Sequence, residues 1–216
     1  EYGNITQLSN LTRLLSDISS ERAISQWEVP LVAQEIKDDL GDSYNYNDVV
    51  DAICLKLMGS KNKGKWGDKT PHYILKLKQL ITLYPEAKYL YIVRDGRDVA
   101  LSLLKKPWGP NNVYKCAEQW DEANNDAQQI LLNDLKEKGQ ILYIKYEKLL
   151  EKTEDECRRI YEFLGDDIEN HRTMVNEFIS TTMSGNSSKW KAKMSSKQIE
   201  IYKIICKILN RGVVTD

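Results

Sequence analysis

One short segment of the sequence combines the residue types needed to bind a phosphate. The apolar run that ends at Val93 is followed by a charged turn containing Arg94, and a helix is expected to begin near Asp98. Ligands of open α/β sheets bind beyond the carboxyl ends of the strands, where the next helix starts. The planar, permanently charged guanidinium of Arg94 suits phosphate oxygens. Ser102, eight positions after Arg94, can bring its hydroxyl towards the same anion from the helix.

A second interpretation of this segment needs no ligand. Arg94 and Asp98 can form a surface ion pair, while Ser102 packs against its neighbours and binds nothing. Spacing alone favours neither interpretation. Gly96 lies in the turn, and glycine allows a backbone conformation with a positive φ at little cost.

The elements that must position this turn follow from short apolar runs between helical stretches. Two runs, Ala87–Val93 and Gln140–Lys145, are rich in Tyr, Ile and Val, which is typical of buried strands. The spacing of apolar residues predicts helices at 8–18, 29–36, 44–57, 73–83, 113–138, 147–164 and 196–209. Short buried strands that alternate with helices indicate an α/β fold, with a parallel sheet flanked by helices on both faces. The length fits a single domain over residues 1–216.

Composition narrows the range of ligands. The 31 basic and 32 acidic residues give a net charge of −1, so nothing draws the whole chain towards nucleic acid or an anionic membrane. The apolar runs are far shorter than a bilayer span. Two histidines and four scattered cysteines predict no metal site and reduced thiols in the core. Any anion site must therefore be a local cluster of basic residues.

The segment from Pro85 to Ser102 resembles the 3′-phosphate-binding segment of the sulfotransferases that use 3′-phosphoadenosine 5′-phosphosulfate (PAPS). The shared pattern is P-x-A-K-Y-L-x-x-V-R-D-x-R-D-x-x-x-S, although many members have proline in place of Gly96. The resemblance implies a P-loop nucleotide-hydrolase-like fold. It also implies that Arg94 and Ser102 hold the 3′-phosphate of the nucleotide.

An upstream segment, WGDKTPHY at residues 66–73, is similar to the family's K-T or D-K-x-P segment. The resemblance implies that Lys69 approaches the transferring sulfate and offsets charge on the leaving phosphate. The alternative is a solvated lysine before a helix that starts at Pro71. For the catalytic base the candidates are Glu1 and His72. The D-K-T-P form resembles the Glu-base branch of bacterial and tyrosylprotein enzymes more than the cytosolic aryl and steroid branch, which favours Glu1.

Two downstream segments complete the resemblance. The run ILYIKYEKLLE at residues 141–151 is similar to the family's strand followed by Y-E-x-L, which implies that Tyr146 borders the adenine pocket. Residues 185–195, GNSSKWKAKMS, stand where the family has a flexible basic segment that closes over the nucleotide. Ser188 and Lys189 are then the phosphate contacts, with Trp190 as an apolar anchor. Trp120 is expected in the core.

The family's basic Ser/Gly/Thr loop, which cradles the 5′-phosphosulfate at a helix N-terminus, has no counterpart in this sequence. The nearest Gly-Lys elements lie at residues 59–65, without the strand before them or the helix after them. We therefore expect the first strand and the phosphosulfate loop to lie upstream of residue 1.

The leading hypothesis is a sulfotransferase that moves a sulfuryl group from PAPS to a hydroxyl or amine, without a metal. The acceptor class is left open between a small molecule, a glycan and a peptide, because variable loops form acceptor pockets. Two rivals remain: a P-loop kinase-like phosphotransferase, and a non-catalytic nucleotide-binding or scaffold protein. We expect a cytoplasmic enzyme in a bacterium, or a Golgi enzyme in a eukaryote if an anchor lies upstream.

Overall fold

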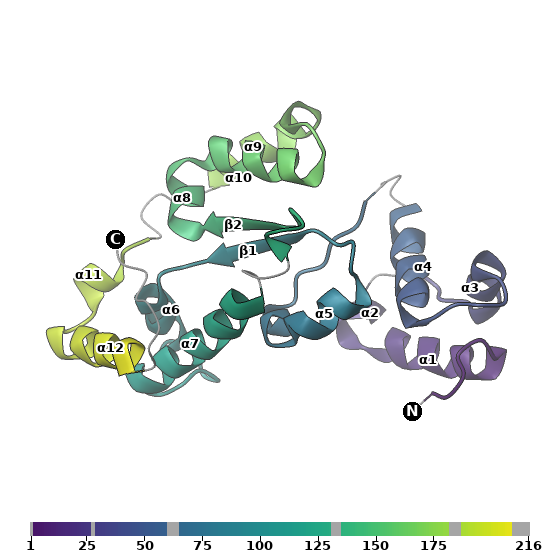
Figure 1. Ribbon diagram of the computed structural model, residues 1–216, viewed down its shortest axis with the longest axis horizontal. Coiled ribbons are helices and arrows are strands. Elements are labelled where there is room, and N and C mark those ends of the chain that lie inside the picture. The colour runs from purple at the N-terminus through teal and green to yellow at the C-terminus, as the bar shows by residue number, and fades with distance from the viewer. Residues whose placement is uncertain (1, 27–28, 60–64, 131–134, 182–186, 209–216) are drawn as a thin grey trace. The chain divides into compact units, whose positions relative to one another are not determined.

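The computed structural model describes residues 2–26, 29–59, 65–130, 135–181 and 187–208. The chain divides into two compact units, Glu1–Thr70 and Pro71–Asp216 (Figure 1). Each unit has its own core of apolar side chains. The single domain over residues 1–216 that is expected from the length stays a prediction.

The first unit is helical. It contains α1 (Leu8–Ser20), α2 (Arg22–Ser25), α3 (Ala33–Leu40) and α4 (Tyr46–Gly59). The apolar positions that predict these helices form its core, including Leu11, Leu15, Ile36 and Val49. The helix expected from residue 29 begins only at Ala33, since the backbone at Val32 is still extended. Asn45 caps α4, since its side-chain Oδ1 accepts the backbone N–H of Asn47 at 2.7 Å.

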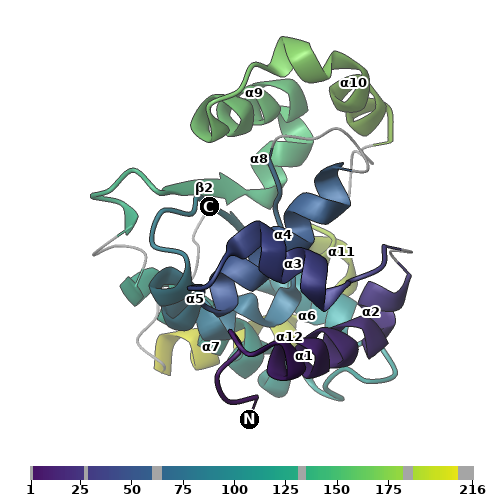
Figure 2. The same cartoon turned by 90° about the vertical axis from the view of Figure 1, so that its right-hand side faces the viewer.

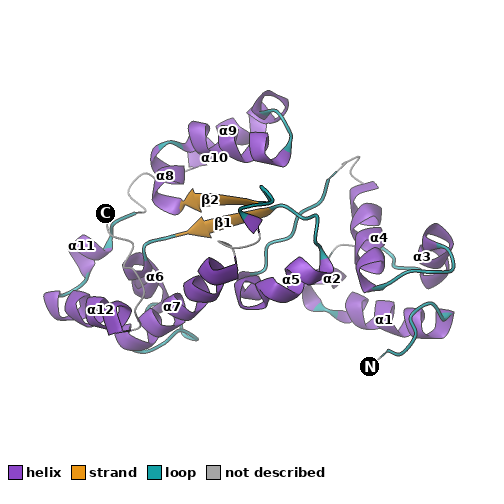
Figure 3. Ribbon diagram, viewed as in Figure 1, coloured by secondary structure: helices purple, strands orange, loops and turns teal. Residues whose placement is uncertain are grey.

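The second unit contains both predicted strands (Figure 3). Its elements are η1 (Pro71–Lys76), α5 (Leu77–Leu83), β1 (Tyr89–Val93), α6 (Gly96–Leu103), α7 (Val113–Ile130), β2 (Ile141–Lys145), α8 (Tyr146–Glu151), α9 (Thr153–Leu164), η3 (Ile168–His171), α10 (Arg172–Thr181), α11 (Trp190–Lys193) and α12 (Ser196–Ile208). The predicted helix over residues 147–164 is divided into α8 and α9, because Lys152 leaves the helical conformation (φ −130°, ψ 52°).

The two strands pair in parallel, with Tyr89 opposite Ile141 and Val93 opposite Lys145. This register places the residues that follow each strand at the same edge of the sheet. The chain after β1 enters α6, and the chain after β2 enters α8. The described residues are thus mostly helical with a small parallel sheet, which is compatible with the α/β class.

The two faces of β1 differ in cover. Tyr89 and Tyr91 pack with Leu77 of α5, and the hydroxyl of Tyr91 donates to Asn124 Oδ1 of α7 at 2.9 Å. Burial raises the pKa of Tyr91 well above its usual value. On the alternate positions, Leu90 and Ile92 are 41% and 52% exposed. Helices on both faces of the sheet therefore stay a prediction.

Two groups of helices surround the strand pair. Helices α9 and α10 lie beyond β2, whereas α7 lies on the side of β1, as Figures 1 and 2 both show. Helices α6, α7 and α12 share one core. It is formed by Ala100, Cys116, Ala117, Tyr202 and Ile205. This core supports the turn that follows β1.

Within the described part of the chain, no helix combines the length and apolar character needed to cross a bilayer. Cys54, Cys116 and Cys157 are free thiols, and burial raises the pKa of each. A reduced state of these thiols, which the sequence analysis expects, stays a prediction.

Candidate nucleotide-binding site

The carboxyl ends of β1 and β2 bring two predicted site residues together. The guanidinium carbon of Arg94 lies 4.7 Å from the centroid of the Tyr146 ring. The backbone N–H of Asp95 donates to Glu147 Oε1 at 3.0 Å, which ties the two turns to each other. Because the register sets Val93 opposite Lys145, the cation and the aromatic ring that follow the strands must be neighbours. A guanidinium over a ring face is attractive, and both remain able to contact a ligand.

The turn between β1 and α6 is held by its own charges. Asp95 caps α6 by accepting the backbone N–H of Arg97 at 2.8 Å. The side chain of Arg97 then donates to the same carboxylate from Nε at 2.9 Å and from Nη2 at 2.6 Å. The sequence predicts that this helix begins near Asp98. In the structure it begins two residues earlier, at Gly96. Trp120 also fixes the turn, since its Nε1–H donates to the backbone oxygen of Arg94 at 3.1 Å.

Gly96 is required for a different reason from the one expected. It lies in α6, and it is not among the glycines with a positive φ. A Cβ at this position would stand 1.7 Å from Tyr202 Oη and 2.7 Å from Trp120 Cδ2. The positive φ that glycine allows is therefore not adopted at this position. Glycine is needed because α7 and α12 approach the helix too closely for a side chain.

The other predicted 3′-phosphate ligand, Ser102, lies near the end of α6 with an exposed side chain. It follows Gly96 by six positions, which corresponds to about 9 Å along a helix axis. Asp98, the partner in the alternative interpretation, is only 2% exposed, so it is not part of a surface ion pair. A joint role of Arg94 and Ser102 on one phosphate stays a prediction.

The segment from Ser188 to Trp190 is also brought to the start of α6. The backbone N–H of Trp190 donates to Asp98 Oδ1 at 2.9 Å, and the guanidinium carbon of Arg97 lies 3.5 Å from the Trp190 ring centroid. Ser188 and Lys189 precede this contact directly, and both are exposed. The structure thus places the second predicted pair of phosphate contacts beside the helix that follows Arg94.

No contact among the described residues tests the roles of the three predicted catalytic residues. Glu1 lies outside the described residues. Lys69 is exposed and belongs to the first unit, in a non-helical stretch where Thr70 donates to Asp68 Oδ2 at 3.4 Å. His72 lies in η1 at the start of the second unit. The roles of Glu1, Lys69 and His72 therefore stay predictions.

Sequence reasoning missed the parts played by Arg97 and Asp98. Both are buried, at 8% and 2% exposure, whereas the sequence analysis assigned no role to Arg97 and only a surface ion pair to Asp98. The sequence does contain a signal for these roles, the Arg-Asp pair that occurs twice in RDGRD. One arginine is enough to bind the phosphate, so the second pair indicates a further role.

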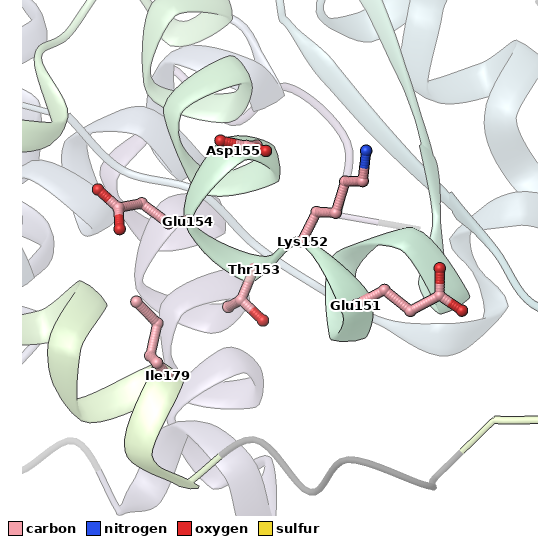
Figure 4. A pocket seen from close by; sticks show the side chains of 6 residues that line it. All are labelled: Glu151, Lys152, Thr153, Glu154, Asp155 and Ile179. Atoms are coloured by element: carbon pink, nitrogen blue, oxygen red, sulfur yellow. The ribbon is translucent and has the colours of Figure 1, made fainter.

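A separate hollow of about 310 Å³ lies where α8 meets α9, close to α10 (Figure 4). It is lined by Glu151, Lys152, Thr153, Glu154, Asp155 and Ile179. Three carboxylates against one lysine repel a phosphate, so this hollow is a poor nucleotide site. Within the described ranges no group of three or more His, Cys, Asp or Glu side chains is placed to hold a metal ion.

Comparison with known proteins gives a consistent set of matches. Residues 8–170, more than half of the chain, match a family model described as "Sulfotransferase family". Protein-tyrosine sulfotransferase A of Caenorhabditis elegans is 30% identical over 132 residues, which cover 56% of this chain and 34% of that protein. Nodulation protein NoeE of Sinorhizobium fredii is 29% identical over 136 residues, covering 54% and 32%. The protein-tyrosine sulfotransferase of Drosophila melanogaster is 23% identical over 144 residues, covering 61% and 28%. Across these proteins and two further Caenorhabditis relatives, the match spans between 28% and 56% of the relative's length.

Proposed function

Because residues 8–170 match its model, the chain belongs to the sulfotransferase family, and we propose that it transfers a sulfuryl group from PAPS to a hydroxyl or amine acceptor. The observation that carries this proposal is the pair formed by Arg94 and Tyr146 at the carboxyl edge of the sheet. A guanidinium that lies over an aromatic ring offers a cation for the phosphate and an apolar surface for the base of a phosphorylated adenosine.

The residues of this edge fit such a nucleotide. The fork of Arg94 can bind two oxygens of the 3′-phosphate, which a single ammonium cannot do. Tyr146 offers a ring against which adenine can pack. Ser102 supplies a hydroxyl from α6, and Ser188 and Lys189 supply a hydroxyl and a cation from the segment before Trp190. The P-loop nucleotide-hydrolase-like fold is part of the proposal, and the parallel strands followed by helices support it.

The chemical step needs positioning and charge more than covalent help from the protein, as in phosphoryl transfer. The acceptor oxygen or nitrogen forms a bond to sulfur while the bond from sulfur to the 5′-phosphate oxygen breaks. The electron pair of that bond stays on the departing phosphate, where the ammonium of Lys69 offsets the charge. The acceptor proton passes to the base, for which we propose Glu1 before His72.

The acceptor proposal starts from the names of the relatives. Four of the matched proteins carry the name protein-tyrosine sulfotransferase, two of them as putative, so a tyrosine hydroxyl in a peptide is the first acceptor to test. A glycan or a small molecule is the second, because variable loops form acceptor pockets in this fold and the matched nodulation protein NoeE does not carry the tyrosine name.

The test compares two nucleotides by calorimetry on the full-length protein. We expect 3′-phosphoadenosine 5′-phosphate (PAP) to bind at least tenfold more tightly than adenosine 5′-phosphate, since one charge-assisted contact contributes about 1.5–3 kcal/mol. Arg94→Lys should remove most of that preference, because a point charge does not replace a bidentate fork. The matched control is Arg159→Lys, which alters an arginine that pairs with buried Glu156 in α9.

Equal affinities of the wild-type protein for the two nucleotides would contradict the proposal. Transfer of labelled sulfate from PAPS to a panel of tyrosine peptides, glycans and small phenols then separates the enzyme from its rivals. Tight PAP binding without transfer to any acceptor supports the non-catalytic alternative. Phosphoryl transfer from ATP supports the kinase-like one.

A further inference from the structure

The start of α6 carries two buried charges that none of the nucleotide contacts explains. Arg97 is 8% exposed. Its guanidinium donates to the carboxylate of Asp95, and the guanidinium carbon lies 3.5 Å from the Trp190 ring centroid. Asp98 is 2% exposed and accepts the backbone N–H of Trp190 at 2.9 Å. Burying a charge is costly unless specific partners compensate it. For both residues, a main partner is Trp190.

Trp190 is also the residue that fixes the short segment before it. Among the described residues, Ser188 alone has a positive φ (56°) without being a glycine. Such a conformation persists only where the surroundings over-determine it. The hydrogen bond to Asp98 and the stack on Arg97 lie two positions after Ser188 and supply that restraint.

The same two charges are connected to the turn that carries Arg94. Arg97 and the helix cap share one carboxylate, that of Asp95, which directly follows Arg94. The backbone N–H of Asp95 in turn reaches Glu147, next to Tyr146. The contacts therefore run without a break from the Arg94 turn to the segment containing Ser188 and Lys189.

We propose that Arg97 and Asp98 are positioning residues for this nucleotide site. They do not touch the nucleotide. They clamp Trp190 against α6, so that Ser188 and Lys189 stand ready to complete the phosphate cradle begun by Arg94. This inference rests on the proposed function, because it concerns the ligand of the same site.

A purely structural role predicts something different. If the clamp served only the core, its loss would lower thermal stability and leave the preference for the 3′-phosphate unchanged. If the clamp positions Ser188 and Lys189, its loss weakens PAP and leaves adenosine 5′-phosphate almost unaffected. Nucleotide binding must also tighten the clamp in return, because coupling between two sites is reciprocal.

The experiment measures affinities for both nucleotides in Arg97→Lys, Trp190→Leu and Trp190→Phe of the full-length protein. Arg97→Lys and Trp190→Leu should each weaken PAP about tenfold, in the range of a desolvated cation–π contact, with less than a twofold change for adenosine 5′-phosphate. Trp190→Phe keeps a ring face under Arg97 and should restore most of the affinity. The double variant Arg97→Lys/Trp190→Leu should bind PAP no more weakly than either single variant, because both substitutions remove the same contact. The control is Trp108→Leu, at a tryptophan that is 76% exposed.

Hydrogen exchange on the wild-type protein gives a second readout that does not depend on a variant folding. Addition of PAP should slow exchange of the amides of residues 190–194, and adenosine 5′-phosphate should not. A wild-type protein without any preference for PAP overturns the proposed function, and this inference with it. Two results overturn this inference alone. The first is a preference of Trp190→Leu for PAP over adenosine 5′-phosphate equal to that of the wild type, and the second is amide exchange at residues 190–194 that PAP does not slow.

Discussion

Replacement of Gly96 by alanine is the sharpest test of how the turn after β1 is built. The added Cβ would stand 1.7 Å from Tyr202 Oη and 2.7 Å from Trp120 Cδ2. Tyr202 is 2% exposed in the core shared by α7 and α12, so its ring has little room to move away. Gly96→Ala therefore forces α12 and the turn apart.

The size of the effect follows from two opposing contributions. Overpacking of a close-packed core costs about 1–3 kcal/mol, and contacts this short belong at the upper end. The alanine gains up to ~1 kcal/mol from helix propensity. The expected net loss in the free energy of unfolding is about 2 kcal/mol. With a urea dependence of about 2 kcal/mol per molar, the unfolding midpoint should fall by about 1 M.

The assay is urea unfolding of Gly96→Ala alone and combined with Tyr202→Phe, which removes the nearest atom. In the Tyr202→Phe background the alanine should cost about half as much, because only the contact with Trp120 remains. Gly59→Ala is the control, since a Cβ there meets nothing within 4 Å. Wild-type stability of Gly96→Ala would refute the close approach. An equal cost in both backgrounds would show that Tyr202 is not the group that excludes a side chain at position 96.

Three further changes have defined outcomes. Lys69→Ala should lower kcat by about 10²-fold, measured by steady-state sulfate transfer, with little change in the Kd of PAP, measured by calorimetry. Unchanged turnover would support the alternative, in which Lys69 is a solvated side chain without a catalytic role. A hydrogen bond from His171, helped by the Asp167 amide and Asn170, lowers the pKa of Asp166 from 3.8 to about 2. The ionised carboxylate therefore stabilises the fold above about pH 4, and this stabilisation is lost as the pH falls towards 2. Urea unfolding should show a stability gap between wild type and Asp166→Asn at about pH 5 that shrinks as the pH falls below about 4, whereas a gap that stays the same from about pH 5 to 2 contradicts the shift. The buried thiols of Cys116 and Cys157 should alkylate more slowly than glutathione at pH 8, as mass spectrometry can follow, because burial raises their pKa.

The parts of the fold that sequence predicts are those that depend on local pattern. Both strands were expected from their β-branched and aromatic residues, and the structure trims them only to Tyr89–Val93 and Ile141–Lys145. The division of residues 147–164 at Lys152 was missed, because no proline or glycine marks it. Element boundaries set by packing leave little trace in a single sequence.

The candidate site divides in the same way. The place of Arg94 after a strand and of Tyr146 after the next one follows from parallel pairing, so their contact could be expected. The contact of Gly96 with Tyr202, and that of Arg97 with Trp190, join residues far apart in the chain. Local propensity cannot encode such contacts, since they exist only once α11 and α12 have packed on α6 and α7.

A crystal structure of the full-length protein with PAP tests the proposed nucleotide site most directly. We expect the 3′-phosphate on the guanidinium of Arg94, within hydrogen-bond distance of the hydroxyl of Ser102, and the adenine beside Tyr146. A nucleotide bound elsewhere, for instance in the acidic hollow between α8, α9 and α10, with Arg94 making no contact to phosphate, would contradict it.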